Sequence, residues 1–336
     1  MGLFADIQKI LQSNLWQSDL PRPQFSFVSP CFNEENNLIA LYDQIVSACS
    51  ESRISDYEIL WIENGSHDGS LEIMRQLRQA NPRLRVISLA RNFGYQGAIS
   101  CGLENARGEW VGIMDADLQD HPRHLLAMWK IAQEQNLDVV YGVRSNRQEG
   151  WFLKLCYKLF YRIWRATAEI QIPVDAGDFS VLSRQVVDTL CSMRERQRFL
   201  RGLRAWVGFR QQGYPYARAA RHAGRSKFNY RGMVLLALDG LLSYSVFPLR
   251  LVSLLGLALV GITGILIFAQ GILRLLQMLG IEMPSPILPP GLTQISLLIT
   301  GLSGLIILIL GIIGEYLGRI YEEVKSRPVY IVRASK

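Results

Sequence analysis

Two acidic residues separated by one position, Asp115 and Asp117, come directly after the apolar run Trp110–Met114. In an extended segment, side chains two positions apart point to the same side, so both carboxylates can face one point. Carboxylate oxygens are ligands that Mg²⁺ and Mn²⁺ prefer, and such an ion would stabilise a diphosphate as a leaving group. An acidic, solvated turn has the same spacing. The position at the end of an apolar run favours a metal site.

Apolar runs and helical patterns alternate along the N-terminal half of the chain. The predicted strands are 25–29, 57–62, 84–89, 110–114 and 138–141, and helical patterns cover 38–46, 71–77 and 97–106. This alternation predicts an α/β domain with a mostly parallel sheet and crossover helices. Ligands of such sheets bind beyond the carboxyl ends of the strands. No G-x-G-x-x-G run follows the first strand, which argues against a dinucleotide-dependent dehydrogenase.

The residues after the predicted strands are polar and occur in an order typical of one enzyme family. The segments are Pro30-Cys31-Phe32-Asn33-Glu34, Asn64–Ser70, Asn92-Phe93-Gly94 and Asp115–Asp120. With them the chain resembles the family 2 glycosyltransferases of the GT-A fold, which is Rossmann-like. It looks closest to the polyisoprenyl-phosphate branch, which includes dolichol-phosphate mannose synthases and bactoprenol glucosyltransferases. Later segments match the same branch, namely Gly177-Asp178-Phe179, Arg204–Phe209, Arg225–Phe228 and Pro248-Leu249-Arg250.

The resemblance implies a role for each matched residue. The positions that hold the nucleotide base and ribose correspond to Pro30, Phe32, Glu34 and Asn64. The sugar-diphosphate site corresponds to Ala116 and Arg144, together with the ligands of Mg²⁺ or Mn²⁺, which are Asp115, Asp117 and Gln119. The segment expected to meet the phosphate of a lipid acceptor is Arg225-Ser226-Lys227.

Asp178 corresponds to the family position that acts on the acceptor, where the expected catalytic role is general base. The acceptor is a phosphate monoester with a second pKa of about 6, so it is already largely anionic at neutral pH. We therefore expect Asp178 to orient the acceptor or the sugar hydroxyls at least as much as it removes a proton. A simple turn is the alternative for Gly177-Asp178-Phe179.

One departure from the family lies after the second predicted strand. Relatives commonly carry Asp-Asp-Gly-Ser where this chain has Glu63-Asn64-Gly65-Ser66. Asparagine both donates and accepts hydrogen bonds, whereas a carboxylate only accepts them. The motif therefore leaves the choice between UDP and GDP open.

Two uncharged runs near the C-terminus each approach the length of a bilayer. Leu251–Leu273 spans 23 residues and Ile295–Gly314 spans 20, and both are apolar on all sides. Buried core helices are the alternative, but they usually keep a polar face. Basic residues flank the pair on one side only, which predicts that both ends face the cytoplasm. Residues 1–19 form no continuous hydrophobic stretch, so no signal peptide is expected.

Basic segments precede these runs. Residues 151–165 and 228–247 have the composition of helices that lie on a membrane surface, although a basic face packed on the sheet is an alternative for the first. Between Arg194 and Arg231 there are eleven Lys or Arg residues and one acid, Glu195, which favours an anionic partner. No nucleic-acid module accompanies this patch, so nucleic acid is not expected, and a lipid phosphate or anionic lipid fits better.

Histidine and cysteine give no metal signal. The five cysteines have no CxxC spacing, so neither zinc nor disulfides are predicted. His121 and His124 have no further ligands nearby and are interpreted as the start of a helix.

We therefore expect an α/β GT-A domain, interfacial helices and two C-terminal membrane spans. The predicted parts are an extension (1–23), the catalytic domain (24–220), a juxtamembrane segment (221–247), two spans within 248–318 (about 249–274 and 292–316) and a cytoplasmic basic tail (319–336). The resemblance implies transfer of a hexose from a nucleotide sugar to polyprenyl (undecaprenyl) phosphate, with inversion, at the inner membrane. Glucose from UDP-glucose is favoured, GDP-mannose is the alternative, and a processive polysaccharide synthase is more distant because Q-x-x-R-W is absent. Relatives also suggest a homo-oligomer, with a tetramer suspected.

Overall fold

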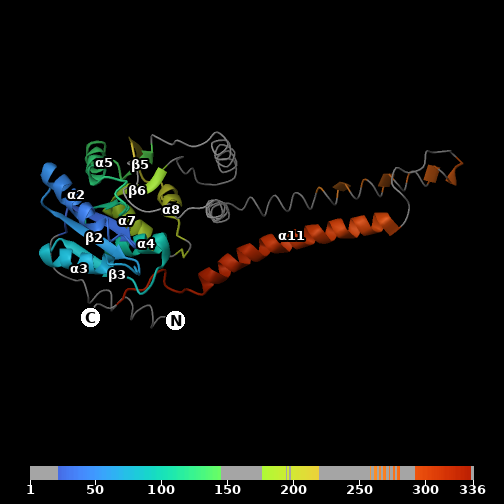
Figure 1. The fold of residues 1–336 in the computed structure, drawn as a ribbon. Coiled ribbons are helices and arrows are strands. Elements are labelled where there is room, and N and C mark those ends of the chain that lie inside the picture. The colour runs from blue at the N-terminus through green and yellow to red at the C-terminus, as the bar shows by residue number, and fades with distance from the viewer. Residues whose placement is uncertain are drawn as a thin grey trace.

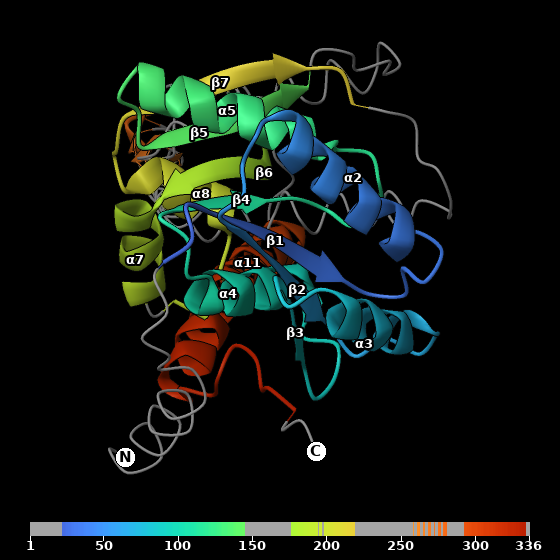
Figure 2. The same ribbon diagram turned by 90° about the vertical axis from the view of Figure 1, so that its left-hand side faces the viewer.

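Seven strands form one sheet in the order β3-β2-β1-β4-β6-β5-β7 (Figure 2). The structure, a computed structural model, describes residues 22–144, 176–218 without 194 and 197, isolated residues between 258 and 280, and 292–333. The strands are β1 (Phe25–Cys31), β2 (Tyr57–Glu63), β3 (Leu84–Ser88), β4 (Trp110–Ile113), β5 (Val139–Arg144), β6 (Ala176–Ser183) and β7 (Gln211–Tyr216). The five predicted strands are confirmed, with ends that differ by a few positions.

The sheet is mostly parallel, as predicted, but one central strand is reversed. β1 pairs in parallel with β2 and β4, and β2 pairs in parallel with β3. β6 is antiparallel to both β4 and β5, whereas β7 is parallel to β5. Every strand except β6 therefore runs in the same direction, and β6 begins at the edge where the others end.

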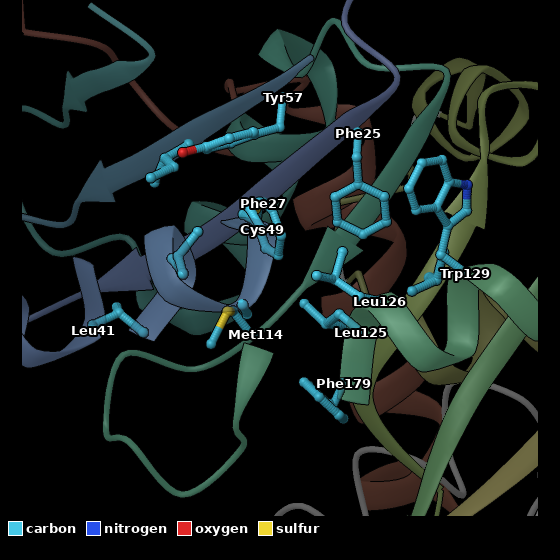
Figure 3. Close-up of a cluster of buried hydrophobic side chains, with 14 of the residues drawn as sticks. Phe25, Phe27, Leu41, Cys49, Tyr57, Met114, Leu125, Leu126, Trp129 and Phe179 are labelled. Carbon is cyan, nitrogen blue, oxygen red and sulfur yellow. The ribbon is translucent and has the colours of Figure 1, made fainter. Parts of the chain in front are cut away.

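Helices cover both faces of the sheet. They are α2 (Leu38–Glu51), α3 (Ser70–Ala80), α4 (Gly94–Asn105), α5 (Pro122–Glu134), α7 (Arg184–Ser192) and α8 (Leu200–Trp206). On β1, Phe25 and Phe27 pack with α2, α3 and α5 on one face, whereas Val28 packs with α4, α7 and α8 on the other. Figure 3 shows the first cluster, in which the rings of Phe25 and Trp129 lie 5.3 Å apart. This alternation is expected for strands buried on both sides.

The helix α11 (Leu292–Val324) extends away from the α/β domain (Figure 1). Its 33 residues give a length of about 50 Å, which exceeds the thickness of a bilayer core. Within the described residues, it is the one helix long and apolar enough to cross a membrane, over Leu302–Val324. The second predicted span, 292–316, thus lies in a helix that continues further. The first span is described only at isolated residues, and 1–21, 151–165 and 228–247 lie outside the described part.

The chain returns to the α/β domain after α11. Val332 forms an antiparallel bridge with Leu89, just beyond β3. The amide of Arg333 donates to the carbonyl of Ser88 at 2.7 Å, and the Tyr330 hydroxyl donates to Glu104 at 2.5 Å. Tyr330 is buried. The segment predicted only as a basic tail therefore also docks on the sheet edge.

Candidate active site

The strand directions bring four separate parts of the chain to one edge of the sheet. β4 and β5 end there, and β6 starts there, because Val143 pairs with Ala176 and Ile113 with Ser180. β7 also ends there, since it is parallel to β5. The sites predicted after β4, at the end of β5 and at the start of β6 therefore share this edge.

The loops after β1 and β2 are joined by hydrogen bonds. The Asn33 amide donates to the Ser66 hydroxyl at 3.2 Å, and the His67 amide donates to the Asn33 side-chain oxygen at 2.9 Å. The Glu34 amide donates to the Ser70 hydroxyl at 2.9 Å. These bonds fix the loop that carries Phe32 and Glu34, both of which are partly exposed.

Asn64 links the loop after β2 to the loop after β3. It is buried, its amide nitrogen donates to Asn92 Oδ1 and the Gly94 carbonyl, and its oxygen accepts from the Phe93 amide at 2.9 Å. The next residue, Gly65, has φ +71, and a Cβ there would lie 2.6 Å from the Arg91 backbone. Asn64 thus uses its side chain to shape the loop, and glycine is required beside it.

Three carboxylates converge on one guanidinium at the end of β4. Arg218 Nη2 lies 3.1 Å from Asp115, 3.8 Å from Asp117 and 3.0 Å from Asp120. The Tyr95 hydroxyl donates to Asp115 at 2.5 Å. These three aspartates and Arg218 are called the acidic cluster below. Its carboxylates outnumber its arginine by two, so it still carries excess negative charge.

The donor set of the acidic cluster fits a hard divalent cation. Three carboxylates already lie within 4 Å of a single positive charge, and oxygen ligands suit Mg²⁺ or Mn²⁺. Burial raises the pKa of Asp115 to about 6, with Asp117 and Asp120 adding to the rise and the Tyr95 bond opposing it. In the part of the chain that is described, no group of three acidic, histidine or cysteine side chains is arranged as a preformed metal site. Arg218 would have to move for a metal to use Asp115 and Asp117.

Asp178 is buried and forms a two-point ion pair with Arg201 of α8. Arg201 Nε lies 3.1 Å from one carboxylate oxygen of Asp178, and Nη2 lies 3.2 Å from the other. The carboxylate of Asp178 raises the pKa of the Arg201 guanidinium above its usual value. One helical turn later, the fully buried Arg204 donates to the Gly177 carbonyl at 3.1 Å. Gly177-Asp178-Phe179 lies in strand β6, so the alternative of a simple turn is wrong.

Tyr95 interacts with both the acidic cluster and the Asp178–Arg201 pair. Burial raises the pKa of its hydroxyl well above the usual value, and Asp115 and Asp178 raise it further. Arg201 in turn interacts electrostatically with Tyr95 and Asp115. The two charged groups therefore belong to one site.

Comparison with known proteins gives this site a family. Residues 26–191 match the family described as Glycosyl transferase family 2. An uncharacterized glycosyltransferase of Bacillus subtilis, YkcC, is 37% identical over 316 residues, covering 93% of this chain and 94% of that protein. The chain belongs to glycosyl transferase family 2. The resemblance predicted from the motifs is confirmed, and the protein is a glycosyltransferase.

Two further comparisons concern named proteins. The bactoprenol glucosyl transferase of Shigella phage SfII is 35% identical to this glycosyltransferase over 316 residues, covering 93% of this chain and 98% of the phage protein. Among solved structures, residues 1–349 of S. aureus TarS in complex with UDP-GlcNAc align with a TM-score of 0.43 and 18% identity, covering 65% and 66% of the two chains.

Ten of the predicted site residues lie in the described part of this glycosyltransferase, and the candidate site has further members that were not predicted. Pro30, Phe32, Glu34, Asn64, Asp115, Ala116, Asp117, Gln119, Arg144 and Asp178 are described, whereas Arg225-Ser226-Lys227 lies outside the described residues. The unpredicted members are Tyr95, Asp120, Arg201, Arg204 and Arg218. Arg201 and Arg204 are one helical turn apart in a stretch that the family motif partly covers, which was a usable signal. No local sequence pattern indicated Arg218, because its partner Asp115 is 103 positions earlier in the chain. His121 caps α5, as predicted.

Proposed function

We propose that this glycosyltransferase moves glucose from UDP-glucose to polyprenyl phosphate, undecaprenyl phosphate in particular, with inversion at the anomeric carbon. The relatives named bactoprenol glucosyl transferase support this proposal, because the match extends over 93% of this chain and 98% of the phage protein. The observation that carries it is the juxtaposition of the acidic cluster with the Asp178–Arg201 pair at one sheet edge. The acidic cluster suits a metal-bound diphosphate, and the acceptor would approach the Asp178–Arg201 pair.

The donor would bind along the ends of β1, β2 and β4. Pro30, Phe32 and Glu34 would contact the base and ribose, beside the loop that Asn64 shapes. Asp115, Asp117 and Gln119 would hold Mg²⁺ or Mn²⁺, with Ala116 and Arg144 near the sugar diphosphate. The ion would neutralise the departing diphosphate. The fixed loops would hold the sugar so that its anomeric carbon faces the acceptor.

The acceptor would react from the side of Asp178. A phosphate oxygen of the polyprenyl phosphate forms the new bond to the anomeric carbon, and the bond to the nucleoside diphosphate breaks. At neutral pH the phosphate monoester is largely a dianion, so no proton has to be removed first. The Asp178 carboxylate is paired with Arg201 on both oxygens, which favours an orienting role over that of general base.

A lipid acceptor requires the enzyme to sit at a membrane. The exposed apolar side chains of α11 support insertion, with the α/β domain and both termini on the cytoplasmic side of the inner membrane and a first span at about 249–274. Arg225-Ser226-Lys227 would meet the lipid phosphate, and residues 151–165 and 228–247 would lie on the surface. The proposal includes a homo-oligomer of four copies, as the resemblance to the polyisoprenyl-phosphate branch implies.

Transfer to an extractable lipid tests the proposal. The full-length enzyme, with undecaprenyl phosphate and Mn²⁺, is given radiolabelled UDP-glucose, UDP-GlcNAc or GDP-mannose in parallel. We expect label in the organic phase from UDP-glucose, and an Asp117→Asn variant should abolish it. Label from GDP-mannose alone would replace glucose by mannose in the proposal. Label from none of the three would refute transfer to the lipid.

A further inference from the structure

Three arginines surround the first residues of β6. Arg201 holds the Asp178 carboxylate through Nε and Nη2. Arg204 donates to the Gly177 carbonyl at 3.1 Å. Arg144 brings Nη2 to 3.9 Å from the position that a Cβ of residue 177 would occupy. These arginines, called the arginine cluster below, outnumber the one carboxylate by two.

Several donors of the arginine cluster have no acceptor among the residues that the structure describes. Arg144 Nε and Arg204 Nη2 are buried there without a hydrogen bond. Arg201 directs its Nε–Nη2 edge at Asp178, and its side chain remains 35% exposed. Leaving a charged donor buried without an acceptor costs free energy, so the arrangement is that of a site which receives an anion.

Within the candidate site, the arginine cluster and the acidic cluster have opposite net charge. Asp115, Asp117 and Asp120 exceed Arg218 by two negative charges, and this cluster complements a cation or a metal-bound diphosphate. The arginine cluster has two positive charges in excess and complements a phosphate that carries no metal. A phosphate monoester at neutral pH has close to two negative charges.

We propose that the Arg201 guanidinium binds Asp178 with one edge and the acceptor phosphate with the other. The buried Arg204 adds positive charge behind this anion subsite, and Arg144 lies between it and the sugar diphosphate. The identity of this phosphate as a polyprenyl phosphate rests on the proposed function. Arginine suits the task because its planar fork has donors on two edges, one for each anion. Asp178 fixes the first edge and thereby aims the second. Lysine, as a single point charge, could hold Asp178 but would not present a second edge.

Binding of a short isoprenyl phosphate tests this inference separately from catalysis. The full-length enzyme is titrated calorimetrically with geranyl phosphate, and in parallel with geraniol and inorganic phosphate. The variants are Arg201→Gln and Arg201→Lys, and the control is Arg210→Gln. Arg210 also pairs with an aspartate, Asp138, at 3.3 Å, but at the start of β7, the opposite edge of the sheet. Protection against thermal unfolding by UDP and Mn²⁺ verifies that each variant retains its donor site.

We expect Arg201→Gln to weaken geranyl phosphate binding about 10-fold or more, which is the loss of one charge-assisted hydrogen bond. The affinity of Arg201→Lys for geranyl phosphate should lie between those of Arg201→Gln and the wild type. The affinity of Arg210→Gln should match that of the wild type. In transfer assays the KM for the lipid should rise while the KM for the sugar nucleotide stays constant. Binding of inorganic phosphate that is lost in the same variants would also support the subsite, as recognition of phosphate alone.

Other results would overturn the inference. Equal binding of geraniol and geranyl phosphate, or unchanged binding in Arg201→Gln, would remove the anion subsite. If Arg201→Gln does not fold, the double variant with Asp178→Asn replaces it, and affinity equal to that of Asp178→Asn alone would be the refuting result. Wild-type enzyme that binds geranyl phosphate but transfers no sugar would contradict only the proposed function.

Discussion

Replacing Arg218 by glutamine should strengthen binding of Mn²⁺ in the absence of nucleotide. In the acidic cluster, Arg218 Nη2 lies 3.1 Å from Asp115 and 3.8 Å from Asp117, the two predicted metal ligands. Arg218 also donates two hydrogen bonds to the buried Asp120, from Nε at 3.1 Å and from Nη2 at 3.0 Å. A metal that uses Asp115 and Asp117 must displace the guanidinium from both. Without Arg218 this competition disappears.

The size of the effect follows from the two displaced contacts. At 4 Å and an effective dielectric constant of about 20, one unit-charge pair is worth about 4 kcal/mol before desolvation is counted. The Arg218 side chain is 21% exposed and that of Asp115 is 31% exposed, so solvent screens much of this energy. At about 1 kcal/mol net for each contact, the affinity for Mn²⁺ should rise about 30-fold.

The electron paramagnetic resonance signal of free Mn²⁺ gives the affinity directly, because the signal is lost on binding. Full-length wild type, Arg218→Gln and Arg210→Gln are titrated under identical conditions without nucleotide. Arg210→Gln removes an Arg–Asp pair far from the cluster and should leave the affinity unchanged. Affinity for Mn²⁺ that is equal or weaker in Arg218→Gln would refute the competition between Arg218 and the metal.

Three other outcomes follow from the site and the docked tail. Burial raises the pKa of Asp115 to about 6, so below that pH its carboxylate is protonated and Mn²⁺ affinity should fall about tenfold per pH unit; an affinity that is flat between about pH 7 and about pH 5 would contradict this. Asp178→Asn should lower kcat at least about tenfold through lost orientation of the acceptor, measured by lipid labelling, and unchanged turnover would remove any catalytic role. Tyr330→Ala should release the tail, so hydrogen exchange at the amides of Ala90 and Arg333, which bridge tail and sheet, should accelerate; unchanged protection would mean that the tail docks without Tyr330.

Local patterns predicted the part of the fold in which each strand precedes its own crossover helix. β1 to β4 are short apolar runs followed by polar loops, so both the strands and the site residues after them could be found in the sequence. The acidic pair after β4 and the polar loops after β1 and β2 are in the predicted places. Their coming together depends only on the common direction of parallel strands.

The features that were not predicted depend on contacts between residues far apart in the sequence. Pairing with β4 and β5 fixes the reversed direction of β6. The segment around Asp178 is therefore the start of a strand and not the simple turn that was the alternative. Arg218 and Asp115 meet across 103 positions, which no local pattern reports. The tail carries an apolar run, Val329-Tyr330-Ile331-Val332, whose β-branched composition was a signal for the edge pairing with Leu89.

In the proposed reaction, the acidic cluster and the Asp178 side of this sheet edge together move a hexose onto a lipid phosphate. Mass spectrometry of the lipid extract tests it most directly, after full-length enzyme has been incubated with UDP-glucose, undecaprenyl phosphate and Mn²⁺. We predict that undecaprenyl phosphate gains one hexose, and that the Asp117→Asn variant leaves it unchanged. Unmodified lipid with the wild-type enzyme, or equal modification by the variant, would contradict the claim.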